Sequence, residues 1–536
     1  MWLNFYIPLL WISLSVIAIA SSTPAPELLT SRAGVATFSL LQQPRQALSL
    51  SNEGDPRTNN CTPVCQYLSR IYQDKISPRG TENYTSFETS FWSIQQSTLS
   101  PLCIFRPQTV KEVAVALHVI TQRECPFSVR SGGHAAFAGA SNIEDGIAFD
   151  LRSLDEVTIS EDGRNAVVGA GSTWYDVYKV LETRNLTAVG ARDGGVGVGG
   201  FILGGGISYV SNLHGWACNN VLNYELVGAD GGIRNIDASH PELFHALCGG
   251  GNNFGIVTHF TLNTFPQGPI WQNARTFNIS QKSTILDAYV SFSLNAPQDI
   301  YSMNSFTSFG YEGGFESINM VFHNLNGTAD PAIFDEIKEI PTLLVREDVE
   351  FLSVLSKILG AASPPGFRNT YWTYTFKVNR EVAGFLIDTF LAAIQPLKHS
   401  IKGLQRINCV LQSITTPTLT HMRNNDMGLS VHDGPYTLAL LSAIWTDESD
   451  DKVIHSTFAE VVRKTKDKAQ EVGVDVEFLY MNYASQFQDP IRGYGEENVR
   501  KLREAAKYDD PEQVLRRLLK GGFKIYGGEY RGGLKT

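Results

Sequence analysis

A run of glycines at residues 194–206 constrains this chain more than any other feature. The segment reads GGVGVGGFILGGG, and eight of its thirteen residues are glycine. Glycine permits positive φ and lets a flat group approach the backbone within contact distance. Two other glycine-rich segments flank it in the sequence, RSGGHAAFAGASN at 130–142 and GGGNNFGIV at 249–257. Together the three segments predict a site where the backbone closes around a ligand.

The spacing G-x-G-x-x-G that begins at Gly195 matches the dinucleotide-binding fingerprint in form only. That fingerprint opens a helix after a strand, and an acidic residue about 20 positions later binds the ribose. Here three more glycines from Gly204 would end such a helix, and the acidic position falls on Asn219 and Asn220. We expect instead a cofactor that lies along several glycine turns, whose N–H groups bind a diphosphate.

Composition limits the other possibilities. The chain has 536 residues, of which 43% are hydrophobic, so we expect two or three domains. Charged residues make up 18%, below the usual fraction of about 25%, which argues against extensive disorder. The formal net charge is -10 and no basic run is present, so we expect no nucleic-acid partner. We also expect a monomer.

The N-terminal residues predict entry into the secretory pathway. Residues 1–20 are almost wholly apolar and end in Ala18-Ile19-Ala20, so we expect a cleaved signal peptide, followed by a loose leader at 21–60. No Lys or Arg precedes Arg32, which leaves an uncleaved membrane anchor as the alternative. Five glycosylation sequons agree with a secreted protein that does not contact a membrane after cleavage: Asn60, Asn83, Asn185, Asn278 and Asn326.

The seven cysteines fall into two groups. Four lie near the start, and in an oxidising compartment we expect two disulfides among them. Three connectivities are possible, of which we favour Cys65–Cys103 with Cys61–Cys125. The later cysteines lie in apolar contexts, where we expect buried thiols, and their spacing indicates no zinc or other metal site: Cys218, Cys248 and Cys409.

Local patterns place the histidine of the first glycine segment after a strand. Residues 103–107 read as a strand, TVKE from Thr109 is a capping box, and apolar residues at helical spacing follow. The strand FSVR then leads into the turn that carries His134. A strand at 146–151, a hairpin within 157–171 and a helix from 174 continue this half. Taken alone, His134 is better explained as a turn residue bonded to a backbone carbonyl.

Glycine becomes sparse after about residue 270, and the pattern there indicates a different domain of mixed strands and helices. Good strand candidates are SINMVFHNL, YWTYTFKV, NCVLQSI and YTLALLSAIW. VEFLYMNYASQF at 476–487 reads as a last strand that breaks into a loop. ENVRKLREAAKYDD at 497–510 reads as an amphipathic helix.

Four segments in this order resemble those of the berberine bridge enzyme-like oxidases, and most closely the fungal secreted members: RSGGHAAFAGASN, VGVGGFILGGGISYVSNLHGWACNNVLNYELV, FHALCGGGNNFGIVTHF, and FLYMNYASQF with KYDDPEQVL and GGFKI. The resemblance covers about residues 60–526. It implies an α+β fold with a two-part FAD-binding domain of the vanillyl-alcohol oxidase or p-cresol methylhydroxylase type at 61–269, whose core is about 99–269. An antiparallel-sheet substrate domain is inserted at 270–475, and the segment 476–526 returns to the FAD domain.

The resemblance implies that His134 bonds covalently to the flavin through a ring nitrogen. A neutral imidazole is a competent nucleophile near pH 7. Many relatives carry a second flavin bond, from a cysteine that aligns with Asp193, and no cysteine lies nearby in this sequence. We therefore expect FAD to be attached through His134 alone, which favours a small metabolite over an oligosaccharide as the substrate.

The resemblance also implies which residues contact FAD. Residues 130–133 would meet the diphosphate, and Asn219 stands where an aspartate is usual, so we expect a changed hydrogen bond there. The cofactor-binding residues carried over are Arg130, Ser131, Gly132, Gly133, His134, Ser141, Asn142, Val196, Gly197, Gly199, Gly200, Gly205, Gly206, Asn219, Asn220, Gly255, Ile256, Val257 and Asn482.

Tyr483, in an Asn-Tyr pair of the last strand, is the catalytic base that the resemblance suggests; core packing is the alternative explanation. A phenol has a pKa of about 10 and needs a cation or a second hydrogen bond to act as a base. Strand alternation would place Tyr483 and Met481 on one face, with Tyr480 and Asn482 on the other.

These observations predict a secreted FAD-dependent oxidoreductase of secondary metabolism. It would transfer hydride from a small-molecule alcohol or amine, or from a ring closed oxidatively, to flavin N5, with O₂ accepting the electrons as H₂O₂. A carbohydrate oxidase that forms lactones, a dehydrogenase with another acceptor and a non-catalytic flavoprotein are the alternatives.

Overall fold

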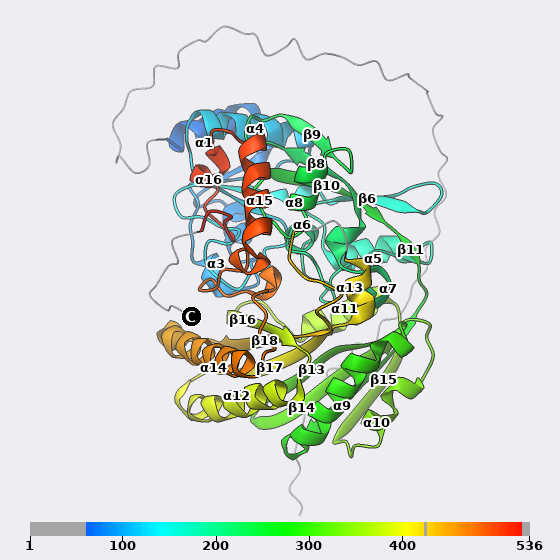
Figure 1. Cartoon of the computed structure of the whole chain (residues 1–536). Coiled ribbons are helices and arrows are strands. Elements are labelled where there is room, and N and C mark those ends of the chain that lie inside the picture. The colour runs from blue at the N-terminus through cyan, green and yellow to red at the C-terminus, as the bar shows by residue number, and fades with distance from the viewer. Residues whose placement is uncertain (1–59, 423–425, 528–536) are drawn as a thin grey trace, which may run out of the picture. The chain divides into compact units, whose positions relative to one another are not determined.

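The computed structural model describes residues 60–422 and 426–527 (Figure 1). The predicted signal peptide at 1–20 and nearly all of the leader at 21–60 lie outside these residues. The five sequon asparagines lie within them and are all exposed, as glycan attachment requires, and glycosylation itself stays a prediction. No helix in the described ranges is long and apolar enough to cross a membrane.

The first half of the described chain begins with a four-stranded sheet ordered β1-β2-β4-β3. Its strands are β1 (Ile76–Pro78), β2 (Cys103–Phe105), β4 (Ile147–Asp150) and β3 (Phe127–Arg130). Helix α4 (Val110–Gln122) connects β2 to β3, and β4 pairs in parallel with both strands. The predicted strand–helix–strand unit is therefore confirmed, with β4 between its two strands.

The capping box predicted at the start of α4 forms only in half. The Thr109 hydroxyl accepts the N–H of Glu112 at 3.3 Å, as predicted. The Glu112 carboxylate accepts the N–H of Gln108 instead of that of Thr109, and it also binds Lys75. The Thr109 hydroxyl thus satisfies one of the unpaired N–H groups at the helix start.

A five-stranded antiparallel sheet, ordered β5-β6-β10-β8-β9, comes next. Its strands are β5 (Val157–Ile159), β6 (Asn165–Gly169), β8 (Val221–Val227), β9 (Ile233–Ile236) and β10 (Ile256–Asn263). β5 and β6 form the predicted hairpin, and helix α5 (Trp174–Glu182) begins after the Thr173 cap.

The central glycine run forms helix α6 (Val198–Leu203), which lasts six residues. It ends where the three glycines from Gly204 begin, and Gly205 and Gly206 have φ of +105° and +89°. Such values are costly for residues with a Cβ. The long helix that a dinucleotide fingerprint opens is therefore absent here.

The middle of the chain forms a seven-stranded antiparallel sheet ordered β15-β12-β14-β13-β17-β18-β16. The strands are β12 (Ile270–Asn278), β13 (Ser302–Glu312), β14 (Phe315–Asn324), β15 (Leu344–Glu350), β16 (Arg368–Lys377), β17 (Arg406–Ile414) and β18 (Tyr436–Trp445). The four segments predicted as strands correspond to β14, β16, β17 and β18. Helices α9 (Lys282–Asn295), α12 (Arg380–Ser400) and α14 (Asp451–Glu471) pack along this sheet (Figure 1).

Side-chain alternation gives the seven-stranded sheet two different faces. Along β17, Ile407, Cys409 and Leu411 belong to the core shared with the helices. Asn408 and Gln412 point to the opposite face and line a cavity. The sheet therefore has one face that stabilises the fold and one that is available for a site.

The C-terminal segment returns to the first half of the chain, as Figure 1 shows for α15 (Glu496–Asp509) and α16 (Val514–Leu518). The Tyr494 hydroxyl donates to the carbonyl of Gly249 at 2.9 Å, and Arg234 pairs with Asp509 at 2.8 Å. The amphipathic helix predicted at 497–510 is confirmed as α15. Long-range polar contacts thus hold the end of the chain against the first half.

The strand predicted at 476–487 is wrong. Residues Met481–Tyr483 form a 3₁₀ turn, and before them a single bridge joins Asp475 to Phe376 of β16. The Gln488 side chain accepts the N–H of Thr373 at 3.0 Å and donates to its carbonyl at 2.7 Å. Because this amide occupies ladder groups at the free edge of β16, a further strand cannot pair there.

The structure contains three disulfides among the described residues. Cys61–Cys125 and Cys65–Cys103 confirm the favoured connectivity. Cys218 and Cys248 also form a disulfide, with Cα atoms 5.0 Å apart, so the prediction of buried thiols is wrong for this pair. The two cysteines are 30 positions apart in the sequence, and the chain between them folds as a strand pair and a helix that bring the two ends together, which spacing alone did not reveal. Cys409 is a buried free thiol, as predicted.

Shorter elements complete the described chain and join the larger ones. They are α1 (Thr62–Ile71), α2 (Glu82–Glu88), α3 (Ile94–Ser97), β7 (Leu186–Thr187), α7 (Ser211–His214), α8 (Pro241–Ala246), β11 (Phe265–Pro266), α10 (Asp335–Lys338), α11 (Leu352–Ala361) and α13 (Thr416–His421).

Candidate active site

A cavity of about 740 Å³ lies between the glycine-rich turns and the open face of the seven-stranded sheet. On one side it is lined by residues 131–137, by 255–257, and by Val196, Gly197, Gly199, Gly200 and Phe201, which we together call the glycine wall. On the other side lie Phe306, Ser308, Asn319, Asn408, Gln412, Leu440 and Ser442, which we call the sheet wall.

Two turns of the glycine wall pack backbone against backbone. A Cβ on Gly132 would lie 2.5 Å from the nitrogen of Gly197, and a Cβ on Gly197 would lie 2.1 Å from the nitrogen of Gly132. A Cβ on Gly200 would instead meet no atom within 4 Å, although Gly200 lines the cavity. The wall is therefore a cradle of exposed backbone, which suits a flat ring and an anionic group.

His134 is the histidine of the glycine wall. It follows Gly133, whose φ of +74° and whose Cβ position, 2.7 Å from the Arg130 side chain, both require glycine. The imidazole stacks on the ring of Trp92, with centroids 4.4 Å apart and planes 10° from parallel. Its Nε2 lies 3.5 Å from the carboxylate of Asp193. The imidazole is thus held in a fixed orientation at the cavity.

Tyr483 lies at the sheet wall and belongs to a network that the sequence did not reveal. Arg192 donates to its hydroxyl oxygen at 2.8 Å, and the Gln412 side-chain amide donates to it at 3.3 Å. Arg192 also donates to the Gln412 carbonyl oxygen at 2.6 Å and to the backbone carbonyl of Ser305. The cation and the second hydrogen bond that a phenolic base needs are therefore both present.

The neighbouring tyrosines of the cavity have different surroundings. Burial, with a smaller contribution from Tyr483, raises the pKa of Tyr371 and of Tyr480 well above the ordinary range. The Tyr480 hydroxyl accepts the N–H of Ile207 at 3.0 Å and a hydrogen bond from Asn482 at 3.1 Å. Tyr371 and Tyr480 therefore stay neutral, and their rings pack edge-on against Tyr483.

Comparison with known proteins identifies the family. Residues 101–237 match the FAD binding domain family. An FAD-dependent monooxygenase of Cochliobolus heterostrophus is 36% identical over 492 residues, which cover 87% of this chain and 94% of the relative. An FAD-dependent monooxygenase of Fusarium proliferatum is 34% identical over 477 residues, which cover 86% of this chain and 91% of the relative.

The chain belongs to the berberine bridge enzyme-like family of FAD-dependent oxidoreductases. Solved structures agree in fold. The 6-hydroxy-D-nicotine oxidase of Arthrobacter nicotinovorans matches with a TM-score of 0.68 at 20% identity, over 83% of this chain and 97% of that one. The xylooligosaccharide oxidase of Myceliophthora thermophila matches with a TM-score of 0.70 at 17% identity, over 87% of this chain and all of that one.

Most residues that the family resemblance assigned to FAD line the cavity. They are Ser131, Gly132, Gly133, His134, Ser141, Val196, Gly197, Gly199, Gly200, Gly255, Ile256, Val257 and Asn482, together with the predicted base Tyr483. Asn482 also donates to the carbonyl of Phe201 at 3.0 Å, which ties the C-terminal turn to helix α6. The glycine cradle and these neighbours fit an FAD, and their individual contacts with it stay predictions.

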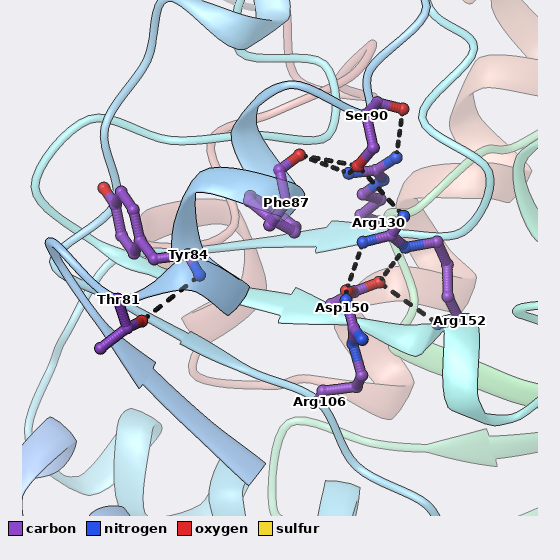
Figure 2. A network of polar contacts seen from close by, with 8 residues as sticks. All are labelled: Thr81, Tyr84, Phe87, Ser90, Arg106, Arg130, Asp150 and Arg152. Carbon is purple, nitrogen blue, oxygen red and sulfur yellow. Dashed lines mark hydrogen bonds and ion pairs between the residues drawn. The ribbon is translucent and has the colours of Figure 1, made fainter.

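The side chain of Arg130 does not line the cavity, which argues against the predicted contact with the diphosphate. Figure 2 shows it turned into the protein, where it donates to the carbonyls of Phe87 and Ser90. Burial and the nearby Arg152 lower its pKa to about 9. Sequence could not reveal this because the acceptors lie 40 or more residues away.

Asp150, at the end of β4, is buried beneath the same cluster (Figure 2). Burial alone would raise the pKa of this carboxyl, but its bonds to Arg152 and Arg106 hold it below the ordinary value. The arginines therefore serve to support the β3–β4 edge from which the turn to His134 leaves.

Five other predicted FAD residues also lie away from the cavity lining: Asn142, Gly205, Gly206, Asn219 and Asn220. The Asn142 amide donates to the carbonyls of Gln96 and Leu99, and the Asn220 amide donates to the carbonyl of Trp216 at 2.9 Å. These side chains fix the loops that carry the glycine wall. Polar residues beside a glycine run can therefore hold the backbone of that run in place, and they need not contact a ligand.

The sequence missed Arg192, Gln412 and Trp92 as site residues. Gln412 could have been found, because strand alternation puts it opposite the buried Leu411. Arg192 directly precedes the aligned Asp193, but nothing in its local pattern shows that its partner Tyr483 lies 291 residues further along the chain. Trp92 reaches His134 from outside any recognised motif.

Proposed function

We propose that this protein is a secreted FAD-dependent oxidase, in which His134 anchors the flavin covalently and Tyr483 takes a proton from a small-molecule substrate. The observation that carries the proposal is the pair of donors, Arg192 and Gln412, directed at the Tyr483 oxygen within the cavity that His134 also lines. When bound, FAD supplies the two-electron oxidation by accepting hydride at N5 and passing the electrons to O₂ as H₂O₂.

Tyr483 suits the role of base because of its contacts. Donors to an oxygen, above all a guanidinium, stabilise negative charge on that oxygen. A substrate hydroxyl or amine bound next to Tyr483 can therefore lose its proton to the phenolate as its C–H bond breaks. Arg406 acts on Tyr371 and Arg192 acts on Tyr480 only as more distant charges, and burial raises the pKa values of both tyrosines, which disfavours the same role.

The sheet wall would bind the substrate. It offers both apolar contacts, from Phe306 and Leu440, and hydrogen-bonding groups, from Ser308, Asn408 and Ser442. This mixture suits a small aromatic or polyketide-like metabolite with a few oxygen atoms. The sequence observation that disfavours an oligosaccharide is Asp193, which stands where many relatives carry a second flavin-binding cysteine.

Monooxygenation is a second candidate because the two fungal relatives named above are both called FAD-dependent monooxygenases. An oxidase releases one H₂O₂ per substrate oxidised, whereas a monooxygenase puts one atom of O₂ into its product. Turnover under ¹⁸O₂ separates the two: the oxidase predicts unlabelled product and stoichiometric H₂O₂, and the monooxygenase predicts labelled product.

Secretion is supported by three disulfides and by the exposure of all five sequon asparagines. The proposal expects a glycosylated monomer in the culture medium. A mass that falls on enzymatic deglycosylation, and a light-scattering mass near one chain, would agree with it. Exclusively intracellular, unglycosylated protein would contradict this part of the proposal.

The proposed function is tested by measuring O₂ uptake and H₂O₂ release with a panel of alcohols, amines, polyketide-like phenols and sugars. With any accepted substrate, Tyr483→Phe should lower kcat about 100-fold or more, because a positioned base contributes about 10²–10⁴. FAD content should stay at the wild-type value. An unchanged kcat in Tyr483→Phe would remove Tyr483 as the base. A preference for sugars would favour the carbohydrate oxidase.

A further inference from the structure

We propose that Asp193 is the positioning residue for flavin attachment: its carboxylate holds the Nε2 edge of His134 and so leaves Nδ1 as the nitrogen that bonds to FAD. The proposal rests on the assignment of His134 as the anchor and goes beyond it. Asp193 stands where the family resemblance places a cysteine in many relatives, and its carboxylate lies beside His134.

The carboxylate of Asp193 is fixed on both sides. Oδ2 lies 3.5 Å from Nε2 of His134, and Oδ1 accepts the N–H of Gly195 at 2.8 Å. A Cβ on Gly360 would lie 2.9 Å from Oδ1, so the backbone of α11 lies close behind the carboxylate. The side chains of His134 and Asp193 are 16% and 17% exposed, and both line the cavity.

The imidazole of His134 is restrained on its ring face as well. Trp92 stacks on it in a nearly parallel orientation, and the Trp92 indole N–H donates to the carbonyl of Ser363 at 2.9 Å. Rotation of the His134 ring is therefore limited by Trp92 on its face and by Asp193 at Nε2. Among the described residues, no side chain or carbonyl hydrogen-bonds to Nδ1, which leaves that nitrogen for the cofactor.

Asp193 carries its negative charge at neutral pH. Burial would raise the pKa of this carboxyl, but its contacts with His134 and the Gly195 N–H hold the pKa below the ordinary value. An anion beside Nε2 favours the tautomer that has its proton on Nε2 and its lone pair on Nδ1. The attacking nitrogen is thereby defined before FAD is attached.

The same carboxylate assists the bond-forming step. Attachment would form a bond from the Nδ1 lone pair to the 8α carbon, release one proton from that carbon to solvent, and leave two electrons on the isoalloxazine ring. O₂ then accepts these electrons and two protons as H₂O₂. Because Nδ1 becomes alkylated while Nε2 keeps its proton, the imidazole becomes cationic. Asp193 stabilises this cation through its contact at Nε2 and does not take the proton, as the aspartate of a catalytic triad stabilises its imidazolium.

The first experiment compares the wild type with Asp193→Asn. Asp388→Asn is the matched control, since Asp388 is an exposed carboxylate that pairs with Lys282. Total FAD is measured by absorbance, and covalent FAD is measured in the acid-precipitated protein. Wild type and Asp388→Asn should hold their FAD covalently. Asp193→Asn should bind FAD but attach it at least about 100-fold more slowly, since loss of the aspartate from a triad costs up to about 10⁴.

A second measurement separates this role from a structural one. Asp193→Ala, loaded with FAD, is incubated with formate, whose carboxylate can enter the cavity, and with formamide as the neutral control. Formate should increase the rate of attachment with concentration, and formamide should not. In addition, nuclear magnetic resonance of the flavin-bearing peptide from the wild type should show the bond at Nδ1.

The outcomes distinguish the proposal from its premise. Wild-type rates of attachment in Asp193→Asn, or a wild-type bond at Nε2, would overturn the role of Asp193 while leaving His134 as the anchor. Equal attachment in Asp193→Ala with formate and with formamide would overturn it too. Fully extractable FAD in the wild type would overturn the anchor, and with it the role of Asp193.

Discussion

The glycine wall of the cavity is built from backbone, whereas the sheet wall is built from side chains. Gly132 and Gly197 approach so closely that neither has room for a Cβ. Across the cavity, Gln412 projects from a regular strand and meets Arg192 and Tyr483 from other parts of the chain. Where two backbones pack this closely, only glycine fits. A strand position that faces the cavity can instead hold many different side chains.

This difference indicates which wall binds the cofactor and which wall determines the specificity for the substrate. The glycine wall can serve any protein that binds the same cofactor, because its geometry depends on the absence of side chains. The sheet wall depends on the identity of each side chain. We therefore expect substitutions in the glycine wall to abolish FAD binding, and substitutions in the sheet wall to change turnover while FAD stays bound.

The largest effect is expected for Gly197→Ala. The new Cβ would lie 2.1 Å from the nitrogen of Gly132, so the two turns must separate. We predict soluble protein with little or no FAD, or failure to fold, as measured by flavin content and by far-ultraviolet circular dichroism.

Gly268→Ala is the matched control, because a Cβ there would meet no atom within 4 Å. It should bind FAD like the wild type. If Gly197→Ala also kept a full complement of FAD, the close packing of the glycine wall would not be needed for the cofactor.

A smaller effect is expected for Arg192→Lys, because Arg192 binds Gln412 of the sheet wall. Lysine keeps the charge but cannot reproduce the planar set of bonds to Tyr483, Gln412 and Ser305. We predict a loss of about 100-fold in kcat, within the range of acid–base contributions, at unchanged FAD content.

Arg184→Lys, at an exposed position that contacts backbone carbonyls, is the control and should behave like the wild type. Loss of FAD in Arg192→Lys would show that the two walls are not separable.

The contrast between the walls also explains what the sequence could predict. The glycine wall could be predicted because the close approaches at Gly132, Gly133 and Gly197 leave no room for any residue except glycine. The strand at 476–487 was predicted wrongly because Gln488 occupies the edge of β16, a contact that depends on the tertiary fold. Arg192 was missed for the same reason, since its partner Tyr483 is brought near only by folding.

A still smaller effect is expected on the stability of the seven-stranded sheet, whose free energy of unfolding should depend on pH through His323. His323 of β14 is buried between Ser305 and Gln272, and burial, with a contribution from Arg192, lowers its pKa to about 3. The unfolded chain, whose histidine has a pKa of about 6.5, therefore binds a proton that the folded chain does not. This contribution to stability is complete above pH 6.5 and is lost as the pH falls toward 3.

From pH 7 to pH 5 the loss at His323 should be about 2 kcal/mol. The free energy of unfolding in urea, measured at both pH values for the wild type and His323→Gln, tests it. The variant should lose less stability over this range than the wild type. The control His399→Gln, at an exposed position, should lose as much as the wild type. Equal losses in all three proteins would mean that His323 is protonated in the fold.

The most direct test of the account is the location of the flavin in the purified wild-type protein. The protein is precipitated with acid, washed, digested with protease, and the flavin-bearing peptide is identified by mass. We predict a yellow precipitate and a single flavin peptide that contains His134. A colourless precipitate, or a flavin on a peptide without His134, would contradict the claim that this residue anchors FAD in the glycine wall.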